Sequence, residues 1–116
     1  MDVRATARYL PISAQKMRLV CDQVRGMDAD QALIVLQFMP HKGAGFLYKL
    51  IESAIANGEM NYEMNRRDLY ISKLEANEGP SMKRVKAGAR GRYKPRVKRS
   101  AHLSVVLTER EEEFVE

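Results

Sequence analysis

The sequence lacks the features that mark secreted, membrane-spanning or disulfide-stabilised proteins. Its one cysteine, Cys21, cannot form a disulfide within the chain. No segment approaches the roughly 20 consecutive apolar residues of a membrane span. The first residues, MDVR, have neither the apolar centre nor the cleavage site of a secretory signal. These absences favour a reducing, cytoplasmic setting and no membrane partner.

Residues that usually carry catalysis or bind metals are equally scarce. His41 and His102 lie far apart, and with a single cysteine they form no metal-ligand spacing. The segment GAG at residues 43–45 lacks the third glycine and the preceding strand of a dinucleotide site, and no phosphate-binding Walker loop is present. Cys21 falls on an apolar helix face, which is typical of an inert core thiol. We therefore expect no cofactor, no metal and no enzymatic activity.

Acidic residues are missing from one segment, residues 81–102, and this segment holds the positive charge of the chain. The protein has 20 basic and 15 acidic residues and a net charge of +5. Without this segment the chain would be net negative, so a single stretch accounts for the whole positive balance. Clustered cations without carboxylates indicate a polyanionic partner. The nine cations are Lys83, Arg84, Lys86, Arg90, Arg92, Lys94, Arg96, Lys98 and Arg99.

The apolar periodicity outlines the secondary structure. It predicts a strand over residues 2–9, helices over residues 13–25, 28–39 and 42–60, and strands over residues 69–76 and 103–108. Helices gathered between strands predict an α+β fold. We expect a small antiparallel three-stranded sheet with three helices packed on one face, in a single domain spanning residues 1–116.

Local signals add detail at the ends of these elements. Ser13 is expected to cap the first helix, and Asp28 with Gln31 resembles a capping box for the second. Asn57-Gly58 suggests that the third helix frays or ends early. On the strand over residues 69–76 either face could be buried, and residues 109–116 are expected to form a fraying acidic tail.

The basic segment is either a flexible loop or a β-hairpin that protrudes beyond the sheet. Val85 and Val97 favour the hairpin, and residues 87–91 supply a flexible turn between them. Pro95 is compatible with a two-stranded ribbon. Such an arm would reach roughly 30 Å at about 3.3 Å per residue. With little apolar surface of its own, it should order only on binding, by contacts to RNA phosphates. Tyr93 could stack on a base.

Several motifs together resemble the bacterial large-subunit ribosomal protein L-twenty-two family. They span nearly the whole chain in the family's order and spacing. They are SAQKMRLV (13–20), VRG (24–26), ESAIAN (52–57), EGPSMKR (78–84), GR (91–92) and KRSAHLSVVL (98–107). The turn differs from the common family pattern at Ala87-Gly88 and at Tyr93.

This resemblance implies a non-enzymatic structural protein of the large ribosomal subunit. It would bind large-subunit (23S-type) rRNA, support subunit assembly, and thread a long protruding β-hairpin (about residues 81–102) toward the nascent-polypeptide exit tunnel. The tip, Ala87, Gly88, Ala89, Arg90 and Gly91, would line the tunnel beside the nascent polypeptide. Partners would be rRNA and neighbouring ribosomal proteins, with no homo-oligomer.

The residues expected to contact RNA fall into two groups. The hairpin group comprises the nine cations named above together with Tyr93, and His102 is expected to make an RNA or packing contact. The second group lies at the start of the first helix, where backbone amides can also bind a phosphate. Its members are Ser13, Gln15, Lys16 and Arg18.

Three functional classes are compatible with these observations to different degrees. The first is a structural ribosomal protein, and the second is a free-standing RNA chaperone or regulator that uses the same arm. The third, an enzyme, has no motif in its favour. Association with large ribosomal subunits distinguishes the first two.

Overall fold

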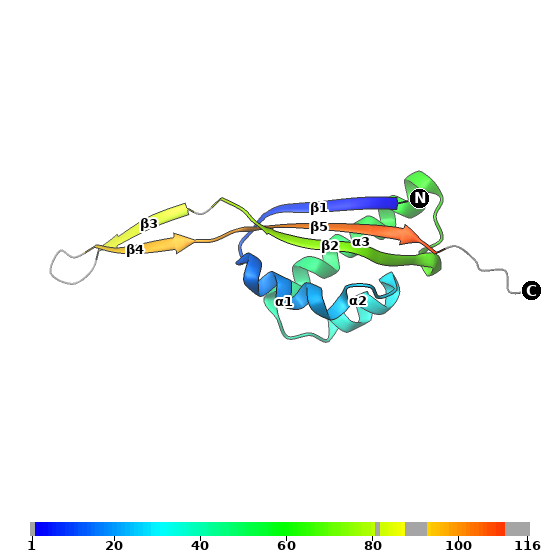
Figure 1. The fold of residues 1–116 in the computed structure, drawn as a ribbon, viewed down its shortest axis with the longest axis horizontal. Coiled ribbons are helices and arrows are strands. Elements are labelled where there is room, and N and C mark those ends of the chain that lie inside the picture. The colour runs from blue at the N-terminus through cyan, green and yellow to red at the C-terminus, as the bar shows by residue number, and fades with distance from the viewer. Residues whose placement is uncertain (1, 81, 88–92, 111–116) are drawn as a thin grey trace, which may run out of the picture.

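The protein consists of a sheet covered by helices and a two-stranded arm that projects from one end of it (Figure 1). The computed structural model describes residues 2–80, 82–87 and 93–110. In chain order the elements are β1 (Asp2–Leu10), α1 (Ala14–Val24), α2 (Ala29–Gln37), α3 (Lys42–Tyr62), the 3₁₀ turn η1 (Arg66–Asp68), β2 (Leu69–Glu78), β3 (Met82–Ala87), β4 (Tyr93–Lys98) and β5 (Ala101–Glu109). The α+β prediction is confirmed.

The last strand of the chain, β5, is the central strand of the three-stranded sheet. It pairs antiparallel with β1 on one side and with β2 on the other. Along β5, Leu103, Val105 and Leu107 are fully buried, whereas Ser104 is half-buried. Alternation along the strand therefore directs Leu103, Val105 and Leu107 toward the helices, as the periodicity predicted, while Val106 is buried on the opposite face.

Strand β2 buries both of its out-of-phase apolar sets. Leu69 and Ile71 are buried in its first half, and Leu74 and Ala76 in its second half. A register shift lies between them, because Ile71 pairs with Leu107 while Lys73 pairs with the next residue, Val106. The extra residue, Ser72, forms a β-bulge that resets the phase of the strand. The sequence left open which face of this strand is buried; because of the bulge, both apolar sets are buried on the same side of the sheet.

Helix α1 begins and ends at the residues that the sequence indicated. Ser13 is its N-cap, and the Ser13 Oγ atom accepts a hydrogen bond from the Lys16 backbone amide at 3.4 Å. Gly26 follows the helix in the left-handed region at φ +85°, a conformation that costs glycine little. The apolar face of α1 packs into the core through Met17, Val20 and Cys21.

Three details of the sequence prediction were wrong. Asp28 is the N-cap of α2 but makes no side-chain capping bond; instead, its carboxylate accepts from Arg110 Nε at 2.9 Å. Helix α3 does not end at Asn57-Gly58 but continues to Tyr62, because buried Gly58 allows Met64 and Val3 to approach closely. Glu109 belongs to β5 rather than to a fraying tail, and residues 111–116 lie outside the described residues.

Strands β3 and β4 form a separate antiparallel ribbon beyond the sheet (Figure 1). It connects β2 to β5, so that the basic segment is a hairpin rather than a loop. The ribbon gives the molecule an elongated outline, with principal-axis extents of 77 × 26 × 19 Å. Its radius of gyration is 18.0 Å, whereas a compact domain of this length would have about 13 Å.

Candidate nucleic-acid interface

The register of the hairpin sorts its residues onto two faces of the ribbon. Arg84 pairs with Arg96 and Lys86 with Lys94. Because directly paired residues lie on the same face and neighbours along a strand alternate, these four positions share one face. The positions of that face are Met82, Arg84, Lys86, Lys94, Arg96 and Lys98. The other face holds Lys83, Val85, Ala87, Tyr93, Pro95 and Val97. The register therefore places five cationic positions on one face of the ribbon.

Part of the predicted hairpin surface lies outside the described residues. This applies to Gly88, Ala89, Arg90, Gly91 and Arg92, that is, to most of the predicted tip. Arg99, between β4 and β5, is exposed at the base of the hairpin.

The second predicted surface lies where α1 begins. Gln15, Lys16 and Arg18 are exposed, and Ser13 is half-buried because its hydroxyl group caps the helix. Figure 1 shows that this end of α1 lies toward the end of the sheet from which the hairpin projects. The fold thus brings the start of α1 and the base of the hairpin to the same end of the molecule.

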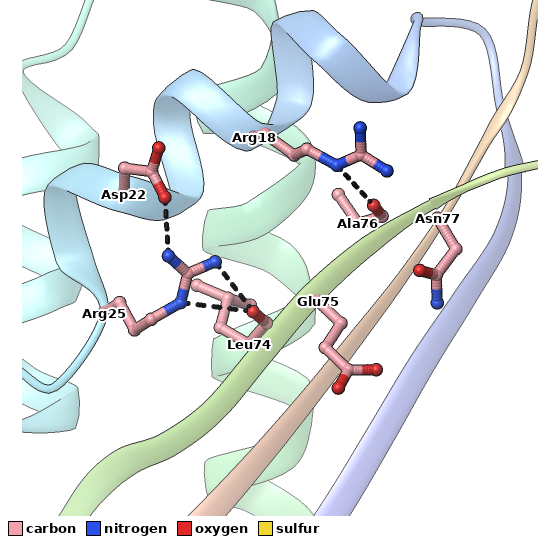
Figure 2. A pocket seen from close by; sticks show the side chains of 7 residues that line it. All are labelled: Arg18, Asp22, Arg25, Leu74, Glu75, Ala76 and Asn77. Carbon is pink, nitrogen blue, oxygen red and sulfur yellow. Dashed lines mark hydrogen bonds and ion pairs between the residues drawn. The ribbon is translucent and has the colours of Figure 1, made fainter.

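Two arginines, Arg18 in α1 and Arg25 directly after it, anchor the helix to β2 (Figure 2). Arg18 Nε donates to the Ala76 carbonyl oxygen at 3.0 Å. Arg25 donates to the Leu74 carbonyl oxygen through Nε at 3.3 Å and Nη2 at 2.9 Å, and its Nη1 contacts Asp22 at 2.5 Å. These residues line a depression of about 350 Å³.

The two arginines differ in what their bonds leave available. The bonds of Arg25 use all three guanidinium nitrogens. Within the part of the chain that the structure describes, no hydrogen bond involves the terminal nitrogens of Arg18 (Figure 2). Arg18 is therefore a fixed cation that can still bind a phosphate, whereas Arg25 is a structural anchor. The sequence interpretation did not single out Arg25, although its spacing of seven residues from Arg18 places both on one side of the helix.

His102 lies in the sheet at the base of the hairpin. Its Nδ1 atom accepts a hydrogen bond from the Tyr9 backbone amide at 3.1 Å. The two rings meet edge to face, with centroids 4.9 Å apart and planes at 89°. Because Nδ1 is the acceptor, the proton of the neutral imidazole lies on Nε2. Of the two contacts predicted for His102, the described residues supply the packing contact.

Comparison with known proteins connects this geometry to one family. The family described as Ribosomal protein L22p/L17e matches residues 5–108, from β1 through the hairpin to β5. The chain belongs to this family. Relatives named large ribosomal subunit protein uL22 include one from Thermoanaerobacter sp. (strain X514), 47% identical over 96% of this chain and 100% of the relative. The relative from Finegoldia magna is 46% identical over 96% and 99%, and that from Desulfotalea psychrophila 47% identical over 94% and 99%.

The L22p/L17e match confirms the resemblance drawn from the sequence motifs. Cys21, on the inner face of α1, is fully buried in this member of the family. Burial raises the pKa of its thiol to about 11, which makes it a poor nucleophile at neutral pH. Among residues 2–80, 82–87 and 93–110, no three His, Cys, Asp or Glu side chains are grouped as metal ligands. In the same described ranges, no helix has the length and apolar character needed to cross a membrane.

Proposed function

We propose that this protein is a structural component of the large ribosomal subunit that binds large-subunit rRNA through its hairpin and the start of α1. The observation that carries the proposal is the register of the hairpin in a member of the L22p/L17e family, which collects five cationic positions on one face. The uL22 relatives are named as proteins of the large ribosomal subunit, a particle that is cytoplasmic in bacteria.

Electrostatic repulsion on the hairpin explains why RNA is the expected partner. Like charges directly opposite each other on an antiparallel pair are destabilising, and Arg84–Arg96 and Lys86–Lys94 are two such pairs in succession. A two-stranded ribbon has no second layer to stabilise it against this repulsion. Phosphates from several strands of a folded RNA would remove it, and each neutralised phosphate adds to the salt dependence of binding.

The start of α1 supports the same partner with a different geometry. Arg18 is held by its bond to Ala76, so that little side-chain freedom is lost when it binds a phosphate. Lys16 is exposed in the first turn of the helix, where the backbone amides also favour anions. The hairpin and the start of α1 lie at the same end of the molecule. This arrangement suits an RNA that surrounds the base of the hairpin.

The remaining parts of the proposal follow from the family resemblance. The hairpin would reach into the subunit, and its tip, residues 87–91, would line the exit tunnel beside the nascent polypeptide. Binding several rRNA segments at once would support subunit assembly. Other large-subunit proteins would be its neighbours, and one copy would act in each subunit without forming a homo-oligomer.

Retention on ribosomal particles tests this function against the alternative of a free-standing RNA chaperone. The tagged protein should sediment with large subunits and stay there during a wash at about 1 M monovalent salt, where the screening length falls to about 3 Å. Retention is expected because an RNA-enclosed hairpin cannot dissociate by screening of surface charge. Release at modest salt, with no protein on the particles, would favour the chaperone and contradict the structural role.

A further inference from the structure

We propose that Tyr9, Gly79 and His102 form a lock at the base of the hairpin, here called the arm-base lock, which fixes the direction in which the hairpin leaves the sheet. These are positioning residues. The inference rests on the proposed function, because a fixed direction matters for a hairpin that must enter a defined RNA path.

Hydrogen bonds join the two segments that connect the sheet to the hairpin. The Gly79 amide donates to the Ser100 carbonyl oxygen at 2.9 Å. The Ser100 hydroxyl group donates to the Pro80 carbonyl oxygen at 2.8 Å. The outgoing and returning segments are therefore held to each other at the point where neither belongs to the sheet or to the ribbon.

Gly79 is required at this point for space rather than for backbone conformation. A Cβ atom there would lie 2.5 Å from Ser100 Oγ and 3.1 Å from His102 Cε1. A side chain at residue 79 would either push the outgoing segment away from the returning one or turn the Ser100 hydroxyl group away from Pro80, and both outcomes loosen the connection. Because the hairpin continues from both segments, a small displacement here changes the direction of the whole hairpin.

Tyr9 supports His102 from the opposite side. Tyr9 is a non-glycine residue in the left-handed region, at φ 59°, and the β1–β5 register shifts between Ala7 and Leu10 around it. Non-glycine residues adopt this conformation uncommonly, and it persists where surrounding contacts hold it. Here the contacts are the hydrogen bond that the Tyr9 backbone amide donates to His102 Nδ1 and the edge-to-face packing of the two rings. They hold the imidazole against Gly79.

The consequence is a hairpin whose base is oriented before RNA binds. Restricting orientation in advance lowers the entropy that is lost on association. The lock orients only the base of the hairpin, and the distal part is expected to become ordered through its contacts with RNA. Loss of the lock should therefore broaden the range of hairpin directions in the free protein and weaken RNA binding.

Distance measurement between spin labels on the hairpin and the body tests this in the full-length protein without RNA. Labels at Lys83→Cys and Glu52→Cys report the hairpin direction relative to α3, and buried Cys21 should remain unlabelled. Gly79→Ala and His102→Gln are the test variants. Gly45→Ala is the matched control, because a Cβ atom at that exposed helical glycine would meet nothing within 4 Å.

We expect Gly79→Ala and His102→Gln each to shift or broaden the distribution of label distances. The distribution of Gly45→Ala should match that of the unmodified protein. His102→Asn should keep more of the original distribution than His102→Gln, because the Asn side-chain oxygen can replace Nδ1 as acceptor from Tyr9. Adding Ser100→Ala to Gly79→Ala should restore part of the distribution by removing the atom at 2.5 Å. Retained thermal unfolding transitions would show that the variants fold, and if Gly79→Ala does not fold, His102→Gln carries the test.

Binding to a transcript of 23S-type rRNA separates this inference from the proposed function. The lock variants should bind about 5- to 30-fold more weakly, the effect of one or two kcal/mol. Unchanged label distances in both folded test variants would overturn the arm-base lock even if RNA binding of the unmodified protein is strong. Absence of RNA binding by the unmodified protein would instead contradict the proposed function and leave the distance result intact.

Discussion

Replacing residues 86–94 by Thr-Asn-Gly-Thr (the Asn-Gly variant) should separate the stability of the body from RNA binding by the hairpin. Val85 and Pro95 are paired directly, but Pro95 has no N–H group with which to close a turn. The two Thr residues therefore form the next pair, which makes the closing hydrogen bonds, and Asn-Gly supplies the two-residue turn in the existing register. The replacement removes the end of β3, the start of β4 and the residues between them. It leaves β1, β2, β5 and all three helices unchanged.

The expected effect on folding is small. β3 and β4 form a sheet of their own, so the three-stranded sheet loses no strand. Shortening the connection between β2 and β5 by roughly a quarter lowers the entropic cost of closing it by about 0.2 kcal/mol. The midpoint of thermal unfolding, followed by circular dichroism, should therefore move by less than about 4 °C.

The expected effect on RNA binding is large and depends on salt. The replacement removes Lys86, Arg90, Arg92 and Lys94. If each neutralises one phosphate, the plot of log K against log salt should become shallower by about 3, at 0.7 to 0.9 per phosphate. Filter binding to a 23S-type transcript at several salt concentrations measures this slope. A full-length variant with the same four residues changed to Gln is the matched control, because it removes charge but not length.

Two results would refute this reasoning. Loss of the cooperative thermal transition in the Asn-Gly variant would show that the hairpin belongs to the folding core. An unchanged salt slope in the Gln variant would show that these four cations do not contact phosphates.

Three further predictions follow from the site and the core. Arg18→Ala should weaken RNA binding and lower the salt slope by about 1, whereas Arg25→Ala, whose guanidinium is fully engaged within the protein, should leave the slope unchanged in the same filter assay. The pKa of the Cys21 thiol is raised to about 11 in the folded protein, so the thiol ionises at lower pH in the unfolded chain than in the folded one. The free energy of unfolding should therefore fall by about 1 to 3 kcal/mol as pH rises from 9 to 11, and urea titrations should show this fall relative to Cys21→Ala. The same pH dependence in the unmodified protein and in Cys21→Ala would contradict the prediction. Deleting Ser72 should lower the free energy of unfolding by only about 1–2 kcal/mol, the contribution of its hydrogen bonds, because strict alternation then runs through β2. Deleting Glu75 instead should lower it further, because Ala76 then turns out of the core. Equal urea midpoints for the two deletions would refute the bulge assignment.

The features that could be predicted from the sequence are those that depend on neighbours along the chain. The nine cations of the hairpin stand in one uninterrupted segment, so charge counting alone located it. The apolar stripe of α1 and its Ser13 cap lie within a few turns of each other, and both were confirmed. Local periodicity and capping chemistry are sufficient for such elements.

The interactions that sequence reasoning missed join residues that are distant in the chain. Asp28 has the spacing of a capping residue, but its carboxylate instead bonds to Arg110, which also lies over the Tyr70 ring at 4.6 Å. A charged partner from the end of the chain offers a stronger bond than a backbone amide at the helix start. No local rule could indicate that choice, because the partner arrives only when β5 enters the sheet.

The bulge in β2 shows the same limit at the level of a whole strand. Leu69 and Ile71 define one phase of alternation and Leu74 and Ala76 the other, so a strand without an irregularity could bury only one set. Ser72 and Lys73 are both polar, and nothing local distinguishes which of them is the extra residue. The distinction comes from β5, where the Ser72 hydroxyl group donates to the Val106 carbonyl oxygen at 3.1 Å and bonds to Thr108 at 2.7 Å. The space required at Gly79 is set in the same way by residues of the returning segment, so the direction of the hairpin is determined by contacts between segments rather than by the basic segment itself.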